Sequence, residues 1–383
     1  MSRPRILCIS FSHFTADSRV LRQLKVLERV GSVTTIGYGE APPRVAEHLE
    51  IDAALPSLPQ TLGGVAKLTA RAYRAVEFDA PAVARAIELL GDRRFDLVVA
   101  NEARALPLAH RVAAGAPVWG DMHEWAPQER THVLSWRLLV APFMTWVCRE
   151  YLPRTKAVST INESIARLYE REFGVRCDVV RNAIDEQHLE PTPMLPGRIR
   201  LVHSGGAVPG RSIETLIDAT KRLDDRFTLD LFLVKARGAD AYWQSLVDRA
   251  AETERVRVHP PVAPADLPRT LNGYDVGVFV LPPRTMNHRL MLPNKFFDFV
   301  QARLALVFST AIETDALIER FDLGAVSPGF GVDELVGTLN GLAEADIARY
   351  KQNADDAASV LTSAEDERVE LSILERLLAG VSG

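Results

Sequence analysis

Cysteine is scarce in this sequence, and the three thiols lie far apart along the chain. Cys8, Cys148 and Cys177 are odd in number and never take the C-x-x-C spacing. A disulfide framework or a cysteine-rich metal site needs more cysteines at closer spacing. We therefore expect a reduced protein that stays in the cytoplasm.

Long hydrophobic runs are also missing. The apolar residues after "MSRPR" are followed within a few positions by Ser10, Ser12 and His13, which predicts a buried first strand instead of a signal peptide. No later run is long enough to span a bilayer. We expect a soluble protein, with contact at the inner face of a membrane as the most that the sequence allows.

Neither sign of charge dominates, and two nucleotide-binding fingerprints are absent. The net charge is −5, from 45 lysines and arginines against 50 aspartates and glutamates. This balance gives no support for nucleic acid as a partner. The chain has neither G-x-G-x-x-G after its first strand nor the pattern G-x-x-x-x-G-K-[ST]. A dehydrogenase or an ATPase is therefore a weak interpretation.

Strand-like and helix-like stretches alternate regularly over all 383 residues. The length favours two domains, and the alternation predicts an α/β fold with doubly wound parallel sheets. The segment "DEQHLEPTPMLPGR", with three prolines, is the linker candidate. We expect two Rossmann-like domains, residues 1–185 and 186–365, that face a central cleft. A C-terminal helix at 366–383 is expected to pack near the first domain.

The segment "HSGGAVPGRS" lies between a predicted strand and a predicted helix. Gly205, Gly206 and Gly210 let the backbone turn tightly and expose its N–H groups, and Arg211 and Ser212 open the helix. The positive end of a helix favours phosphate. Glycine alone fits a plain strand–helix turn equally well. Arg211 favours the phosphate interpretation, because a cation at a helix start is unfavourable unless an anion is near.

A second candidate is the stretch "LPNKFFDF". Pro293 begins a predicted helix, Lys295 lies beside its first amides, and Asp298 follows one turn later. In an arbitrary helix both charges would simply be solvated. Arg211 at another strand end of the same domain changes this interpretation, because two cations that converge suggest a phosphorylated ligand. Asp298 could then accept hydrogen bonds from two neighbouring hydroxyls, such as those of a ribose.

Polar residues also follow three predicted strands of the first half. In open α/β sheets, ligands bind at the carboxyl ends of strands. A lone histidine is more often structural, but a histidine between two carboxylates at a strand end favours a functional role. The three groups are His13, Asp17 and Arg19; Asn101 and Glu102; and Asp121, His123 and Glu124. Asp17 fits a helix cap better than a ligand contact.

Two stretches could contact a membrane. The aromatic residues and methionine of "SWRLLVAPFMTWVCREYL" have helical spacing, which is more typical of core packing than of a membrane-seeking face. "KLTARAYRAVEF" carries Lys67, Arg71 and Arg74, which could meet anionic lipid or a lipid-diphosphate acceptor. They could equally form a solvated helix face.

Four motifs resemble those of GT-B glycosyltransferases of family four, in the order of that family. "GDMHEW" resembles a motif of the N-terminal domain, "RNAIDEQHL" the interdomain signature, "HSGGAVPGRSIETLIDA" the phosphate loop, and "LPNKFFDFVQARLALVFS" the nucleotide-sugar segment. The resemblance implies a retaining transfer of a sugar from a nucleotide diphosphate to a hydroxyl acceptor. A role in the synthesis of cell-surface polysaccharide or glycoconjugate would fit this activity.

The resemblance, together with the polar loops, assigns roles to residues. His123, Arg211 and Lys295 are the expected catalytic residues. The expected donor-binding residues are Gly205, Gly206, Ser212, Val262, Leu292, Pro293, Asn294 and Asp298. The acceptor or sugar side is expected at His13, Arg19, Glu102, Asp121 and Glu124.

The expected co-substrate is a nucleotide sugar, and we expect no resident cofactor. UDP-sugar is favoured, because backbone contacts at the "HPPV" turn suit a small base, and GDP-sugar stays open. The acceptor would be a saccharide or a lipid-linked molecule. No Asp-x-Asp pair occurs in the chain, so we expect no metal.

The chain departs from the family pattern at several positions. Asp298 stands where the family usually has glutamate, Arg303 replaces the usual glycine, and Ala305 replaces the usual proline. Leu290 stands where many members carry a further glutamate, and Gly206 replaces a basic residue of the phosphate loop.

Three alternatives remain. A nucleotide-sugar 2-epimerase of the same fold would use carboxylates such as Glu102, Asp121 and Glu124 as acids and bases. A natural-product glycosyltransferase would share the donor site. A two-domain solute-binding protein would be exported, which the first strand does not favour.

Overall fold

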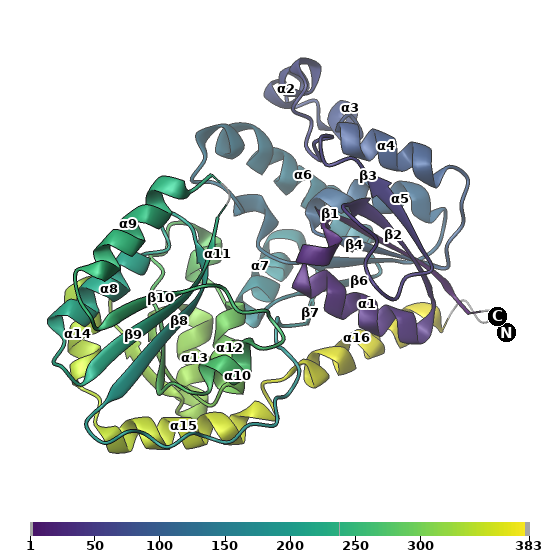
Figure 1. The fold of residues 1–383 in the computed structure, drawn as a ribbon. Helices are drawn as coiled ribbons and strands as arrows, with labels where there is room; N and C mark the ends of the chain where they lie inside the picture. The colour runs from purple at the N-terminus through teal and green to yellow at the C-terminus, as the bar shows by residue number, and fades with distance from the viewer. Residues whose placement is uncertain (1–2, 237, 380–383) are drawn as a thin grey trace. The chain divides into compact units, whose positions relative to one another are not determined.

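The computed structural model describes residues 3–236 and 238–379, and the chain divides into two compact units. The first unit comprises the chain up to Arg181, together with Thr285–Asn287 and the chain from Asp366 on. The second comprises Asn182–Arg284 and His288–Glu365. Each unit is built on one parallel sheet (Figure 1), so the predicted class of two Rossmann-like units is confirmed. The domain boundary between residues 185 and 186 and the central cleft stay predictions.

The sheet of the first unit has the strand order β3-β2-β1-β4-β5-β6-β7, and the strands pair in parallel. This order starts near the middle and grows outwards in both directions, as in a doubly wound fold. The strands are β1 (Arg5–His13), β2 (Ser32–Tyr38), β3 (Glu47–Ile51), β4 (Leu97–Asn101), β5 (Val118–Met122), β6 (Ala157–Thr160) and β7 (Asp178–Val179).

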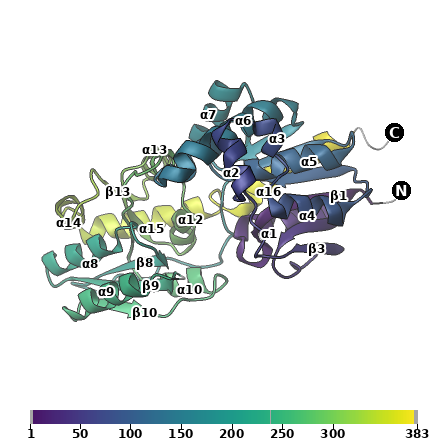
Figure 2. The same ribbon diagram turned by 90° about the horizontal axis from the view of Figure 1, so that it is seen from above.

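Helices cover both faces of this sheet (Figures 1 and 2). On one face, Ile6 and Cys8 of β1 share a core with Leu24 of α1 and with Ile373 and Leu374 of α16. The opposite face carries α4 and α5 (Figure 1). The helices are α1 (Ser18–Val30), α2 (Leu62–Thr69), α3 (Tyr73–Val76), α4 (Pro81–Leu90), α5 (Leu106–Ala113), α6 (Ala141–Tyr151), α7 (Glu163–Phe173) and α16 (Ser363–Leu378). Residues 380–383 of the expected C-terminal helix lie outside the described residues.

The second unit has the strand order β10-β9-β8-β11-β12-β13, again with parallel pairs. Alternate residues of its strands enter two cores. Leu201, for example, faces the core shared with α8 and α14, whereas Val202 faces the core shared with α12 and α15. The strands are β8 (Ile199–Ala207), β9 (Phe227–Lys235), β10 (Val256–His259), β11 (Val276–Phe279), β12 (Ala305–Ser309) and β13 (Gly324–Ser327).

The phenylalanines of α12 explain why this helix lies so close to the second sheet. Phe296, Phe297 and Phe299 are fully buried. A methyl group at Gly277 of β11 would lie 2.3 Å from the Phe299 ring, so only glycine lets this ring pack on the strand. The helices of the unit are α8 (Ile213–Arg222), α9 (Asp240–Ala251), α10 (Leu267–Leu271), α11 (Met286–Arg289), α12 (Asn294–Gln301), α13 (Ile312–Phe321), α14 (Val332–Asn340) and α15 (Glu344–Ala358). Of α11, the first two residues belong to the first unit.

Several local features agree with the sequence, and others differ. The Asp17 side chain accepts a hydrogen bond from the amide of Val20, which confirms it as the cap of α1. Strand β8 continues through Ala207, so Gly205 and Gly206 belong to the end of the strand and not to a loop. The edge strands β3 and β13 have no counterpart in the predicted pattern. None of the described helices combines the length and the apolar character that a bilayer crossing requires.

Arg303 keeps the backbone conformation that a glycine would favour. Its φ is +60°, in the left-handed region. The buried side chain compensates through several bonds: Nε donates to Asp355 Oδ1 at 2.6 Å, Nη1 to the Gln301 carbonyl at 2.7 Å, and Nη2 to the Gln187 carbonyl at 2.7 Å. At the position where the family pattern has glycine, Arg303 thus has an unfavourable backbone conformation, which its buried hydrogen bonds stabilise.

This account predicts a difference between two substitutions at one position. Arg303→Ala loses the network and keeps the strained backbone, whereas Arg303→Gly loses the same network and relieves the strain. We expect the glycine variant to be about 1 kcal/mol more stable than the alanine variant, and both to be less stable than the parent. Urea unfolding of the three proteins measures this difference. A glycine variant no more stable than the alanine variant would contradict the strain at this position.

Candidate functional site

In each unit, polar and charged side chains gather at the carboxyl ends of the central strands. In the second unit they lie around the ends of β8 and β11 and the start of α12, and in the first they follow β4 and β5. Open parallel sheets bind ligands at this edge.

Lys295 lies in the first turn of α12 and is almost fully buried, with 8% of its surface exposed. Its Nζ lies 4.2 Å from the centroid of the Phe279 ring at the end of β11. A methyl group at Gly205 would lie 3.2 Å from the same nitrogen, and the φ of Gly205 is +140°. Glycine at this position of β8 therefore provides both the backbone conformation and the space beside the lysine.

The surroundings of Lys295 disfavour its charged form. Burial and the nearby positive charge of Arg211 lower the pKa of Lys295 to about 7, although Asp298 acts in the opposite direction. Burial, Lys295 and Arg211 also lower the pKa of His203 to about 3, so this histidine is neutral. Its Nδ1 donates to the Val278 carbonyl at 2.9 Å. The cationic groups of this strand edge thus lie close enough to repel one another.

Arg211 and Arg284 add positive charge beside the glycine-containing turn. Arg211 is exposed and precedes Ser212, the N-cap of α8, whose φ is +53° and whose side chain makes no capping bond. A methyl group at Gly210 would lie 2.6 Å from Nη1 of Arg284. In the described part of the chain, neither arginine has a recorded carboxylate partner within ion-pair distance. Two exposed guanidinium groups therefore lie next to the first turn of a helix.

The other predicted donor residues lie near the start of α12 or pack against its core. Asp298 is half-buried and close enough to Lys295 to influence its pKa. Leu292 is buried, Pro293 is the N-cap of α12, and Asn294 is exposed. Val262 follows β10 in a segment without regular structure and packs against the α12 core.

In the first unit, Asp121 and Arg19 form a buried ion pair. Arg19 Nη2 lies 2.7 Å from Oδ1 of Asp121, and Arg19 Nε lies 2.8 Å from Oδ2. Ser159 also donates to Oδ1 at 2.6 Å. Burial alone would raise the pKa of Asp121, but Arg19 and His123 hold it well below its usual range. Arg19 also donates to the Val180 carbonyl, so it is placed to support Asp121 from within the core.

His123 follows β5 and is held by the neighbouring strand ends. Its Nε2 lies 3.1 Å from Oδ1 of Asn101 and 3.4 Å from Oδ2 of Asp121. Asn101 Nδ2 donates to Gln23 Oε1 at 3.1 Å, which leaves Oδ1 as the acceptor. Both partners of Nε2 are acceptors, so Nε2 carries a proton. The opposite nitrogen, Nδ1, lies 4.0 Å from Oε1 of Glu102.

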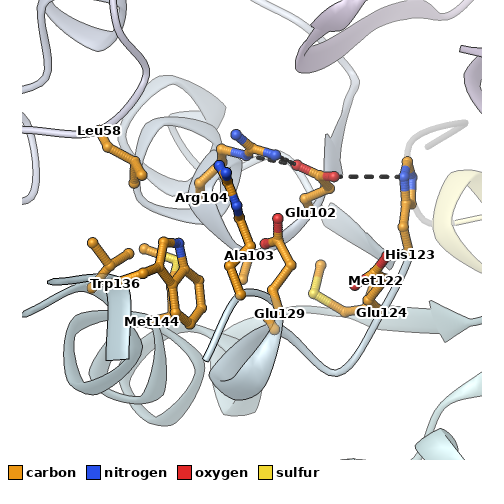
Figure 3. A pocket seen from close by; sticks show the side chains of 13 residues that line it. Leu58, Glu102, Ala103, Arg104, Met122, His123, Glu124, Glu129, Trp136 and Met144 are labelled. Atoms are coloured by element: carbon orange, nitrogen blue, oxygen red, sulfur yellow. Dashed lines mark hydrogen bonds and ion pairs between the residues drawn. The ribbon is translucent and has the colours of Figure 1, made fainter. Parts of the chain in front are cut away.

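A pocket of about 530 Å³, with open solvent at its mouth included, lies beside His123. Figure 3 shows Glu102 between Arg104 and His123. Glu102 has a φ of +68°, a strained conformation for a side chain of this size. The pocket is lined by Leu58, Glu102, Ala103, Arg104, Met122, His123, Glu124, Ala126, Glu129, Arg130, Trp136, Val140 and Met144.

Two carboxyl groups of this pocket, those of Glu124 and Glu129, have raised pKa values. Desolvation of the carboxyl by surrounding protein atoms, together with the charges of Glu129 and Glu102, raises the pKa of Glu124 to about 7, even though part of this residue is exposed. Burial and Glu102 also raise the pKa of Glu129. Carboxyl groups in this state could donate or accept a proton.

The structure separates His13 from the other first-unit candidates. His13 is exposed at the end of β1, with its ring 5.9 Å from the Tyr38 ring, and it is not among the described residues that line the pocket. Glu102, Asp121, His123 and Glu124 do lie together. Arg104, Glu129 and Arg284 were not expected from the sequence. Glu129 and Arg284 reach these positions through tertiary structure, whereas Arg104 lies two residues after Glu102 and its Nε donates to Glu102 Oε2 at 2.6 Å.

Asn287 is another residue that the sequence did not suggest. It belongs to the first unit and is buried. Its Oδ1 accepts from the Trp125 amide at 2.8 Å, and its Nδ2 donates to Glu124 Oε2 at 2.8 Å. Asn287 thus fixes both the backbone and the carboxylate of the segment after His123.

Comparison with known proteins identifies this architecture. Residues 29–188 match the family model described as Glycosyltransferase Family 4. This part of the chain is similar to family-four glycosyltransferases, and the chain has the GT-B fold. A comparison of the sequence with curated proteins found no match.

Solved structures resemble the chain over nearly its whole length. Anabaena Alr3699/HepE in complex with UDP and glucose is 16% identical, with a TM-score of 0.67, over 98% of this chain and 100% of that one. The E. coli trehalose-6-phosphate structure bound with UDP-2-fluoro glucose is 12% identical, with a TM-score of 0.63, over 97% and 98%. The trehalose 6-phosphate synthase of Burkholderia multivorans is 11% identical, with a TM-score of 0.67, over 100% of both chains. At these identities the likeness establishes the shared fold.

The pKa of Lys295 predicts how nucleotide binding depends on pH. Below about pH 7 the side chain is an ammonium, and above it an uncharged amine. Because a diphosphate attracts only the ammonium, we expect the dissociation constant of UDP to rise by up to about tenfold per pH unit above this pH. Calorimetric titrations with UDP across neutral pH measure this change in the dissociation constant. Lys295→Met should flatten the profile, and a parent profile that is already flat would contradict a titrating lysine at the site.

The hydrogen bond from Asn287 to Glu124 predicts a second pH effect. Asn287→Ala removes a donor that favours the carboxylate, so the pKa of Glu124 should rise further above about 7. The limb of the kcat/KM profile that reports Glu124 should then move to higher pH. Asn340→Ala, at an exposed asparagine of α14, is the matched control. An unmoved limb in Asn287→Ala would show that Asn287 does not tune this carboxyl.

Proposed function

We propose that this enzyme is a retaining glycosyltransferase that uses a UDP-sugar and acts in the synthesis of cell-surface polysaccharide or glycoconjugate. The observation that carries the proposal is the group of three cationic side chains, Arg211, Arg284 and Lys295, at the strand edge of the second unit. The HepE and E. coli structures that resemble it contain UDP, UDP-glucose or a fluorinated UDP-glucose. A GDP-sugar is the alternative donor.

The donor diphosphate would relieve the repulsion among these cations. Bound phosphate oxygens would favour the ammonium of Lys295 and accept from the guanidinium groups of Arg211 and Arg284. The amides of the first turn of α8 would add further donors. When the bond between sugar and phosphate breaks, negative charge grows on the departing diphosphate, and donors already aimed at it stabilise the transition state. Three protein cations would supply this charge without a metal.

The remaining residues of the second unit would orient the nucleotide. Asp298 would accept hydrogen bonds from the two ribose hydroxyls, and its shorter side chain would draw the ribose closer to α12 than a glutamate would. The turn around Val262 would contact the base through its backbone. Leu292, Pro293 and Asn294 would shape the approach to the first turn of α12.

The first unit would supply the sugar and acceptor side. His123, with Nε2 fixed as a donor by Asn101 and Asp121, would present its ring to the transferred sugar. Glu102 and Glu124 would bind hydroxyl groups of a saccharide or lipid-linked acceptor in the pocket. With retention of configuration, the departing phosphate would take the proton of the acceptor hydroxyl. Arg19 would act as a positioning residue through Asp121.

A 2-epimerase is the second candidate, because Glu102, Glu124 and Glu129 gather carboxyl groups around one pocket. Such groups could remove and return a proton on a bound sugar. Incubation of the enzyme with UDP-sugar and no acceptor, followed by NMR, separates the two functions. A C2 epimer would establish the isomerase, whereas UDP release only with an acceptor would establish the transferase.

A thermal-shift panel tests the donor assignment. A ligand that binds only the folded protein raises its melting temperature by mass action. We expect UDP to stabilise the parent, and Arg211→Ala and Lys295→Ala to reduce this shift and lower turnover by about 10²–10³-fold. Arg222→Ala, at the other end of α8, is the matched control.

The other outcomes are equally informative. Stabilisation by GDP but not by UDP would change the base of the proposed donor. Normal turnover of Arg211→Ala and Lys295→Ala at saturating donor would remove these residues from the diphosphate site. Indifference to every nucleoside diphosphate would overturn the proposed function.

A further inference from the structure

The aromatic side chains that suggested a membrane face from sequence are largely part of the core. Trp136, Phe143, Met144 and Tyr151 are buried, as core packing predicts. Of the three cations in the neighbouring stretch, Lys67 pairs with Asp79 and Arg74 with Glu150. A contact surface on the first unit must therefore consist of other residues.

Other apolar side chains of the same two stretches are exposed. Leu62 is 94% exposed and Val65 38% exposed on α2, while Leu134 and Leu138 are 59% and 55% exposed around the π-helix η4 (Trp136–Val140). Helices α2 and η4 contact each other, so these side chains lie over adjoining elements. Single exposed leucines are common, but four large apolar side chains on adjoining elements indicate an interaction surface.

Arginines border these apolar side chains. Arg137 and Arg149 are exposed and line an open groove that also contains Tyr73 and Trp146. Arg71 is exposed too and donates to the Tyr73 hydroxyl at 2.8 Å. No carboxylate partner within ion-pair distance is recorded for these three arginines among residues 3–236 and 238–379. Uncompensated arginines beside tyrosine, tryptophan and leucine match the chemistry of a lipid–water interface with anionic headgroups.

The same short helix separates this surface from the pocket. Trp136 and Val140 of η4 line the pocket beside His123, whereas Arg137 and Leu138 of η4 are exposed. A π-helical turn places these side chains differently from a regular helix and is often found at functional sites. A headgroup bound at the outer side of η4 would lie next to the wall of the pocket.

We propose that Leu62, Val65, Leu134 and Leu138, together with Arg71, Arg137 and Arg149, form a docking surface for a bilayer that contains anionic phospholipid. We call these seven residues the docking surface. The leucines and valine insert among the lipids, and the arginines bind the phosphate groups. The proposal rests on the proposed function in one respect. A transferase that docks on a bilayer would take a lipid-linked saccharide as its acceptor, and this acceptor would reach the pocket past η4.

Vesicle sedimentation tests the docking surface without nucleotide or turnover. We expect the parent to sediment with phosphatidylcholine vesicles that contain phosphatidylglycerol, and much less with phosphatidylcholine alone or at high salt. Arg137→Gln with Arg149→Gln should weaken binding by about 25-fold, since each arginine near an anionic surface contributes about fivefold. Leu134→Ser with Leu138→Ser should also weaken it, and because both side chains are exposed, the fold should persist.

Matched controls change the same residue types elsewhere. Arg171→Gln with Arg176→Gln, on exposed residues of the first unit, and Ile312→Ser, at an exposed residue of the second, should bind like the parent. Parent-like binding of both docking-surface variants, or binding that ignores phosphatidylglycerol, would overturn the proposal. If those variants instead change a dimer to a monomer in sedimentation velocity, the surface belongs to a second copy of this chain.

Failure of docking and failure of the proposed function are separable. Loss of vesicle binding with UDP stabilisation intact concerns the docking surface only. Vesicle binding without any response to nucleotides would leave the docking surface in place and overturn the transferase donor site.

Discussion

A buried ammonium beside a second cation is the constraint on which the strand edge of the second unit depends. Lys295 lies against Phe279 and Gly205, and its pKa falls to about 7 because burial and Arg211 both oppose its charge. The folded unit therefore keeps positive groups together at a cost in free energy, and a polyanion would relieve that cost. Like charges that are held close together, with shifted pKa values, are more typical of binding sites than of regions that only support the fold.

The first unit shows the opposite arrangement of charge. Arg19 neutralises the buried Asp121, and this pair holds His123 in place together with Asn101. The neighbouring carboxyl groups of Glu124 and Glu129 are only partly compensated by His123 and Arg104, and burial and like charges raise their pKa values. Asp121 therefore stays ionised and orients His123, whereas Glu124 and Glu129 take up a proton more readily. Positive charge thus gathers in the second unit, and titratable acid gathers in the first.

Sequence patterns predicted the parts of this molecule that depend on local periodicity. The alternating strands and helices, the cap at Asp17 and the approach of Lys295 to Arg211 follow from residue types and their spacing. Arg284 could not be found in this way, because its proximity to Gly210 depends on how two loops fold. The left-handed backbone at Arg303 and the exposure of Leu134 instead of Trp136 likewise depend on tertiary packing. Edge strands such as β3 lack a clear apolar pattern because one side remains open.

The central claim is that the cationic strand edge of the second unit binds a diphosphate. Calorimetric titration with UDP and with uridine under the same conditions tests it most directly, because the two ligands share base and ribose. Charge-assisted hydrogen bonds contribute about 1.5–3 kcal/mol each, so two of them predict that UDP binds at least about 10²-fold more tightly than uridine. Equal affinity for UDP and uridine would contradict the account.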